Sequence, residues 1–259
     1  YSQRKTIIVS PLVALIDDQG AALAHSGVQV SKLHSGLSRD ENVEQWKKFA
    51  SGVAKILYMS PERLMQPRML DALQKQTIGM FVVDEAHCIS KWGADFRPDY
   101  EALAQLKTVF PETVIAAFTA TADKATRSDI VTKLAIRDGS VFVKGFDRPN
   151  LSLQVMPKQD IKGKLLDFLA DRRRQSGIIY CLSRNETDQF CEFLKTNGFN
   201  AIAYHAGKTA EFRREAQNRF MTEDAVVMVA TIAFGMGIDK PDIRYIVHAS
   251  MPSSVEAFY

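Results

Sequence analysis

The feature that most constrains the fold is a regular alternation of short apolar segments with helix-like segments. In the first half of the chain, strand-like segments occur at 6–9, 28–33, 55–59, 78–84, 114–119 and 141–143, and helix-like segments at 12–25, 40–50 and 127–134. In the second half, strand-like segments occur at 177–181, 201–204, 226–230 and 243–248, and helix-like segments at 186–197 and 210–221. This order favours an α/β fold with doubly wound parallel sheets.

A break in the alternation divides the chain. It falls at Gly145-Phe146-Asp147-Arg148-Pro149-Asn150, where Pro149 disfavours a helical conformation at Arg148. A chain of 259 residues also suits two medium-sized domains better than one. We therefore predict an amino-terminal lobe at 1–145, a linker at 146–152 and a carboxyl-terminal lobe at 153–259.

Two adjacent carboxylates follow the apolar segment that ends at Val83. These are Asp84 and Glu85, and His87 comes two residues later. In a nucleotide hydrolase, the first carboxylate at such a strand end holds Mg²⁺ and the second orients or deprotonates the attacking water. The alternative interpretation is a solvated strand end, where an Asp-Glu pair is also common.

Polar residues follow several other predicted strands, at the end where open α/β sheets bind ligands. They are Ser10-Pro11, Ser60-Pro61-Glu62-Arg63, Thr119-Ala120-Thr121, His205-Ala206-Gly207 and Thr231. Each of them alone is explained by helix capping or turn formation. Together, in both halves, they predict a ligand-binding cleft between two facing sheets.

These segments resemble the successive motifs of superfamily 2 helicases. Three longer segments are similar to RecQ-type DNA helicases: 86–100, with Trp92-Gly93-Ala94-Asp95-Phe96-Arg97; 146–151, Phe-Asp-Arg-Pro-Asn-Leu; and 233–241, Ala-Phe-Gly-Met-Gly-Ile-Asp-Lys-Pro. Lys91 and Ala94 stand where the family pattern usually has Gln and His. The resemblance implies two RecA-like lobes and an ATP-dependent DNA helicase that moves 3′ to 5′ on single-stranded DNA and unwinds duplexes, in DNA repair and recombination.

The resemblance also implies roles for individual residues in ATP hydrolysis. Asp84 would hold Mg²⁺, Glu85 would activate water, and His87 would relay the nucleotide state to Thr119 and Thr121. From the second lobe, Asp239 would contact the ribose or nucleotide edge. Gly235 and Gly237 would allow the backbone to approach the nucleotide closely.

A second set of residues is expected to contact nucleic acid. Trp92 and Phe96 beside Arg97 suit stacking on unpaired bases. The three hydroxyl residues at strand ends would touch the sugar-phosphate backbone without reading sequence; they are Ser10, Ser60 and Thr231.

Two parts of such a motor do not occur in this sequence. A Gly-x-x-x-x-Gly-Lys-[Ser/Thr] phosphate loop is absent. Gly207-Lys208-Thr209 resembles its tail, but Ile202 occupies the first glycine position, and we reject it. The family places the loop before Tyr1 and its final arginine motif after Tyr259. We therefore expect a helicase core fragment that by itself does not hydrolyse ATP at a helicase-like rate.

Composition narrows the remaining possibilities. The net charge is only +3, with Lys+Arg 33 against Asp+Glu 30, so charge alone does not indicate nucleic acid binding. No apolar run is long enough to span a membrane, and Cys88, Cys181 and Cys191 have no disulfide or zinc spacing. We expect no membrane association and a reducing compartment, the bacterial cytoplasm or the eukaryotic nucleus.

Two other functions remain open from the sequence. One is a DEAD-box-like RNA helicase, which the 92–97 loop and the 234–237 segment argue against. The other is an inactive DNA-binding fragment, which the missing phosphate loop favours. Among residues outside the motifs, His25 and His34 flank predicted element ends and are interpreted as surface residues.

Overall fold

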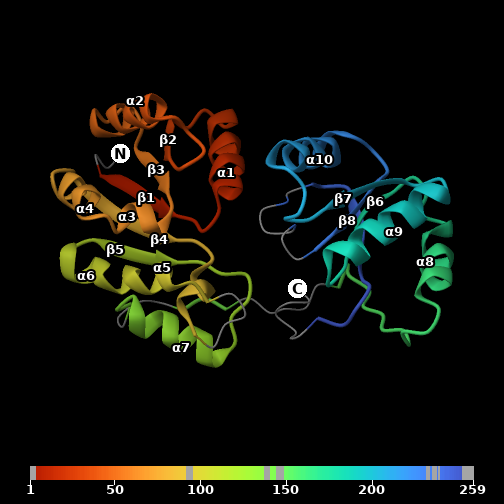
Figure 1. Cartoon of the computed structure of the whole chain (residues 1–259). Helices are drawn as coiled ribbons and strands as arrows, with labels where there is room; N and C mark the ends of the chain where they lie inside the picture. Colours follow the sequence, from red (N-terminus) through yellow and green to blue (C-terminus); the bar gives the residue numbers. More distant parts are fainter. Residues whose placement is uncertain are drawn as a thin grey trace. The chain divides into compact units, whose positions relative to one another are not determined.

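The computed structural model describes residues 4–91, 96–136, 141–143, 149–231, 234, 238 and 240–252. The chain divides into two compact units, one formed by 1–143 with 254–259 and the other by 144–253 (Figure 1). Of the predicted linker, 146–148 lies outside the described residues, and Pro149 and Asn150 form a turn. Within the described ranges, none of the helices combines the length and apolar character that crossing a bilayer requires.

The first unit contains a five-stranded parallel sheet with the order β2-β3-β1-β4-β5. Its strands are β1 (Lys5–Val9), β2 (Val30–Leu33), β3 (Ile56–Met59), β4 (Ile78–Val83) and β5 (Val114–Ala117). Its helices are α1 (Val13–His25), α2 (Arg39–Ala50), α3 (Pro61–Leu64), α4 (Pro67–Gln74), α5 (Pro98–Glu101), α6 (Leu106–Val109) and α7 (Lys124–Lys133), with 3-10 turns η1 (Ala86–Ile89) and η2 (Ala102–Gln105).

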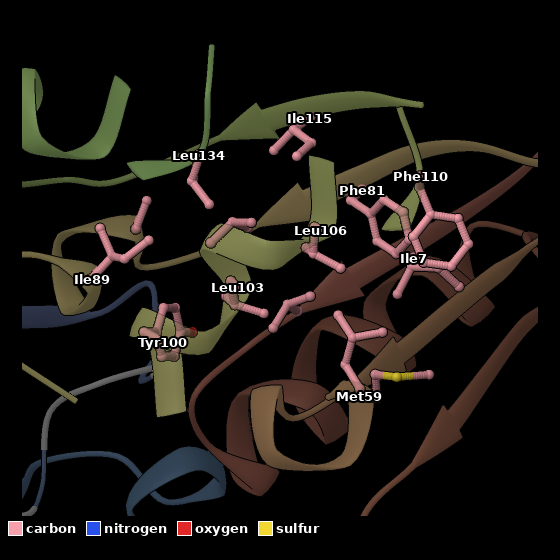
Figure 2. Packing of buried hydrophobic residues seen from close by; sticks show 14 of the residues in the cluster. Ile7, Met59, Phe81, Ile89, Tyr100, Leu103, Leu106, Phe110, Ile115 and Leu134 are labelled. Carbon is pink, nitrogen blue, oxygen red and sulfur yellow. The ribbon is translucent and has the colours of Figure 1, made fainter. Parts of the chain in front are cut away.

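Alternate residues of these strands form one face of the core. Because successive side chains of a strand point to opposite faces, one face receives every second residue of each strand. Ile7, Leu57, Phe81 and Ile115 belong to a single buried cluster, which α4 to α7 and both 3-10 turns also enter. In Figure 2, the ring of Phe81 lies beside that of Phe110, and their centroids are 5.0 Å apart.

One predicted strand of this unit is wrong. Residues 141–143 form no strand, and the side chain of Phe142 is 90% exposed. No described strand pairs with them, so the apolar tripeptide has neither ladder hydrogen bonds nor a core to enter. Helix α4 was not predicted, because its eight residues are too few for a clear helical repeat.

The second unit contains a four-stranded parallel sheet with the order β7-β8-β6-β9. Its strands are β6 (Ser176–Tyr180), β7 (Asn200–Tyr204), β8 (Val226–Ala230) and β9 (Ile243–His248). Its helices are α8 (Ile161–Ala170), which was not predicted, α9 (Arg184–Thr196) and α10 (Ala210–Thr222).

Both faces of this sheet are buried, each in its own cluster. Val227 and Val229 pack with α8 and α9, whereas Val226 and Met228 of the same strand pack with α10. A strand that is covered on both sides reads as a continuous apolar run, which explains why 226–230 was predicted with its observed bounds.

The two units share one topology. In each unit the first three strands alternate with two helices along the chain. The second and third strands lie on one side of the first strand in the sheet, and the next strand lies on its other side. Thus β1, α1, β2, α2, β3 and β4 correspond to β6, α9, β7, α10, β8 and β9. The prediction of two α/β lobes is confirmed.

We predict that Gly177→Ala destabilises the second unit. Gly177 pairs with Tyr245 of β9, and an added Cβ would collide with the Tyr245 ring, which also packs edge-on against Phe168. Overpacking of this kind costs about 1–3 kcal/mol. Thermal and urea unfolding of the 259-residue chain measure the effect.

The double variant Gly177→Ala/Tyr245→Val supplies the control. Removing the ring makes room for the new methyl group, so the double variant should be more stable than the sum of the two single changes predicts. Additive losses would contradict the collision.

Candidate active site at the carboxyl edge of the first sheet

The register of three neighbouring strands brings the ends of β1, β4 and β5 together. Val83 pairs with Val9 on one side and with Ala117 on the other. Beyond the strand ends, the Asp84 N–H donates to the Val9 carbonyl at 2.9 Å, and the Ala86 N–H donates to the Phe118 carbonyl at 2.9 Å. The segment that begins at Asp84 is therefore fixed between the chain that follows β1 and the chain that follows β5.

Two hydrogen bonds orient the carboxylate of Asp84. Its Oδ1 accepts the N–H of Glu85 at 3.0 Å, and its Oδ2 accepts Nε2 of Gln19 at 2.9 Å. Each oxygen keeps further lone-pair capacity, and the side chain is only half-buried. Gln19 was not among the predicted site residues, because it lies on α1 and contacts Asp84 across 65 residues of chain.

This arrangement fits a magnesium ion that arrives with a nucleotide. The described residues contain no group of three or more His, Cys, Asp or Glu side chains that could hold a metal ion. Mg²⁺ does not need such a group, since it is usually bound by one or two carboxylates together with phosphates and water. Asp84 meets that requirement.

Glu85 has an unusual backbone conformation. Its φ and ψ are 48° and 45°, in the left-handed region, immediately before η1. A residue with a Cβ pays roughly 1–2 kcal/mol for this conformation. Its Oε2 lies 3.3 Å from Nδ1 of His87, so the turn brings the second carboxylate close to the histidine.

His87 is hydrogen-bonded to the end of β5. Its Nδ1 lies 2.8 Å from Oγ1 of Thr119, and that hydroxyl in turn lies 2.9 Å from the Thr121 carbonyl and 3.3 Å from the Thr121 N–H. A carbonyl only accepts, so the hydroxyl proton points to it. Nδ1 of His87 must then carry a proton and donate to Thr119. The expected grouping of His87, Thr119 and Thr121 is present.

The segment that carries the predicted aromatic loop is attached to the same edge. Arg97 donates through Nη1 to the Pro11 carbonyl at 3.2 Å, and its own N–H donates to Cys88 at 2.9 Å. The Tyr100 hydroxyl donates to the Asp84 carbonyl at 3.0 Å. Burial, reinforced by the nearby Cys88 and Asp84, raises the pKa of Tyr100 far above its ordinary value, so this donor stays protonated.

Phe96 has a cationic environment. Its ring is half-buried, and the ammonium groups of Lys91 and Lys133 lie 5.6 and 6.0 Å from its centroid. Trp92 lies outside the described residues, as do Gly235, Gly237 and Asp239 of the second lobe. Their predicted roles stay predictions.

The three hydroxyl residues predicted to touch nucleic acid differ in accessibility. Ser60 caps α3 by accepting the Arg63 N–H at 3.4 Å, and Thr231 is half-buried after β8. Ser10, in contrast, is 0% exposed, and its hydroxyl has no hydrogen-bond partner in the described part of the chain. Core packing around the end of β1 buries this short side chain, so the geometry does not support a direct contact of Ser10 with DNA.

Two further interpretations can be checked. His34 was interpreted as a surface residue, but it is 4% exposed, because its ring folds back and Nδ1 accepts the Gly36 N–H at 3.2 Å. The rejected Gly207-Lys208-Thr209 segment is a helix start: Thr209 caps α10, and Lys208 pairs with Asp188 at 2.9 Å.

Two family models match the chain. The DEAD/DEAH box helicase model matches residues 1–130, and the helicase conserved C-terminal domain model matches residues 160–259. Curated relatives include the ATP-dependent DNA helicase RecQ of Pasteurella multocida, which is 40% identical over 98% of this chain and 40% of its own length. Another is the RecQ-like DNA helicase BLM of Xenopus laevis, 39% identical over 98% of this chain and 19% of its own length.

Solved structures agree with this fold. Dbp5 of S. cerevisiae bound to RNA and ADP BeF3 aligns with a TM-score of 0.72 at 16% identity, covering 97% of this chain and 64% of that one. The helicase Lhr of Mycobacterium smegmatis, bound to ssDNA and AMP-PNP, aligns with a TM-score of 0.66 at 19% identity, covering 98% of this chain and 37% of that one. At such identities the likeness concerns the fold.

The chain thus spans about two fifths of the length of the bacterial relatives that it matches. The predicted resemblance to superfamily 2 and RecQ-type helicases is confirmed by these relatives and by the matching domains. The chain belongs to the DEAD/DEAH box helicase family, with RecQ-type DNA helicases among its relatives.

Proposed function

We propose that this chain is the motor core of an ATP-dependent DNA helicase that moves 3′ to 5′ along single-stranded DNA. The observation that carries the proposal is the constellation at the end of β4, in which Asp84 is oriented by two donors and His87 is bonded to Thr119 on the neighbouring strand. The names of the relatives favour DNA as the nucleic acid. The cellular process would be DNA repair or recombination, in the bacterial cytoplasm or the nucleus.

The geometry suggests how the acidic pair divides the work. Asp84 would hold Mg²⁺, which when bound compensates the phosphate charge. Glu85 would orient or deprotonate the attacking water, and the protonated Nδ1 of His87, 3.3 Å from its Oε2, would help to hold the carboxylate in place. The bond from His87 to Thr119 would let a change at the nucleotide move the segment that follows β5.

DNA and ATP hydrolysis would be coupled through short connections. Arg97 is bonded to the chain after β1, and Tyr100 is bonded to the backbone of Asp84 itself. Movement of Arg97 on binding DNA would therefore be passed to the chain that follows β1, and movement of Tyr100 to the backbone of Asp84.

The choice of nucleic acid tests the proposal directly. In the protein expressed from its complete open reading frame, single-stranded DNA should stimulate ATP hydrolysis more than RNA of the same sequence and length. Duplexes with a 3′ overhang should be unwound, and those with a 5′ overhang should not. Stronger stimulation by RNA would instead identify an RNA helicase, and binding without hydrolysis would identify a DNA-binding fragment.

Glu85→Gln should block the chemical step and preserve nucleotide binding. The amide keeps the shape of the side chain but cannot accept the proton, and loss of a general base costs about 10²–10⁴ in rate. We expect that decrease in kcat with an unchanged Kd for a non-hydrolysable ATP analogue. Glu112→Gln, an exposed residue before β5, is the matched control. Near-normal turnover of Glu85→Gln would assign water activation to another residue.

Gln19→Met should weaken the use of Mg²⁺ without removing any ligand of the ion. Methionine has a similar shape but cannot donate to Asp84 Oδ2, and loss of such an orienting partner weakens metal binding about 10–100-fold. The Mg²⁺ concentration that gives half-maximal binding of a fluorescent ATP analogue should rise accordingly. The kcat at saturating Mg²⁺ should stay close to that of the unchanged protein.

Gln74→Met on the exposed side of α4 is the control for this substitution. A lower kcat at saturating Mg²⁺, with an unchanged Mg²⁺ requirement, would show that Gln19 does not act through the metal-binding carboxylate.

A further inference from the structure

A cavity lies at the carboxyl end of β2, an edge strand of the first sheet. It has a volume of about 530 Å³ and is formed by the end of β2, the loop that follows it, and α2, α3 and α4. Its lining includes Asn42, Trp46, Arg39, Arg63 and Arg68. Three strand spacings, about 14 Å, separate β2 from β4, so this cavity is distinct from the candidate magnesium site.

The cavity has a strong positive charge without compensation. Its lining contains three arginines and no aspartate or glutamate. In the part of the chain that the structure describes, none of the three forms an ion pair with a carboxylate. Planar guanidinium groups favour phosphate, with which they form paired charged hydrogen bonds. An anionic ligand is therefore favoured over a neutral one.

Two buried polar atoms in the cavity walls lack partners. Nε of Arg63 is a donor and Oδ1 of Asn42 is an acceptor, and neither has a hydrogen-bond partner in the described residues. The orientation of the Asn42 amide is fixed, since its Nδ2 donates to the carbonyls of His34, Leu37 and Ser38. An unpartnered buried donor or acceptor costs roughly 1–3 kcal/mol. Both atoms have almost no accessible surface, so a ligand would recover that loss only if the side chains of Arg63 and Asn42 shift toward the cavity.

Most of the remaining lining is apolar and includes an aromatic ring, and His34, Ser35 and Gln66 also border the cavity. Trp46 is half-buried, and Leu37, Val43 and Met69 lie around the same space. Inorganic phosphate would leave this part unused. A nucleobase fills it better, because a base has an apolar face for Trp46 and an edge that carries donors and acceptors.

We propose that this cavity binds one unstacked nucleotide of single-stranded DNA, with its phosphate on the arginines and its base beside Trp46. The inference rests on the proposed function for the presence of a DNA strand at this edge. It adds a site that holds a base, beyond contacts to the sugar-phosphate backbone. Such a site would fix the position of the DNA strand beside β2, the edge strand of the first sheet.

Tryptophan fluorescence can test the proposal on the 259-residue chain. The sequence has two tryptophans, so Trp92→Phe leaves Trp46 as the single reporter. We expect its emission to change on titration with dTMP and with oligo-dT, and not with inorganic phosphate or with an oligonucleotide whose sites are all abasic. Arg63→Met and Arg68→Met should each weaken oligo-dT binding about 10–150-fold, the range for one hydrogen bond to a charged group.

Lys75→Met, which removes a charge outside the cavity, is the matched control and should have a much smaller effect. If oligo-dT binds but Trp46 and the two arginine variants do not respond, the cavity proposal is wrong while the helicase proposal stands. An equal response to the abasic oligonucleotide or to inorganic phosphate would reduce the site to a phosphate contact and overturn the base assignment.

Discussion

The parallel pairing of β4 with β1 and β5 is the constraint on which the candidate site depends. Backbone bonds continue past the strand ends, from Asp84 to Val9 and from Ala86 to Phe118. These backbone hydrogen bonds fix the position of Asp84 and Glu85 without any contribution from side chains. Slippage of β4 by one residue would turn Val83 away from the core and separate His87 from Thr119. Chemistry at this edge is thus a consequence of strand register.

The two lobes repeat one local device as well as one topology. In each lobe, a histidine after the second strand folds back so that its Nδ1 accepts the N–H of a glycine two residues later. The Nε2 atoms of these two histidines, His34 and His205, face Asp17 and Asp188 on the preceding helices, at 3.3 and 3.1 Å. A hydroxyl residue then caps the next helix in both lobes. In the second lobe this device occupies the segment that resembles a phosphate loop.

Much of the fold could be predicted because its strands are buried and rich in branched side chains. The bounds of β8 and β9 were correct, and the grouping of Asp84, His87 and Thr119 was expected from the family resemblance and agrees with the rule that strand ends meet at one edge. Predictions failed where distant contacts decide the outcome. The segment at 141–143 has the composition of a strand but no partner, and Ser10 has the position of a ligand contact but is enclosed by the core. No local sequence pattern marked Gln19 as a partner of Asp84.

The left-handed backbone conformation of Glu85 lowers the stability of the fold at the same residue whose carboxylate is proposed to act in hydrolysis. Glycine or asparagine would adopt this conformation at lower cost, whereas glutamate pays for its Cβ and keeps its carboxylate next to His87. A variant of this lobe selected for thermostability alone would therefore tend to lose the second carboxylate first. Engineering a more heat-resistant form of this chain would have to protect that position and gain its stability elsewhere.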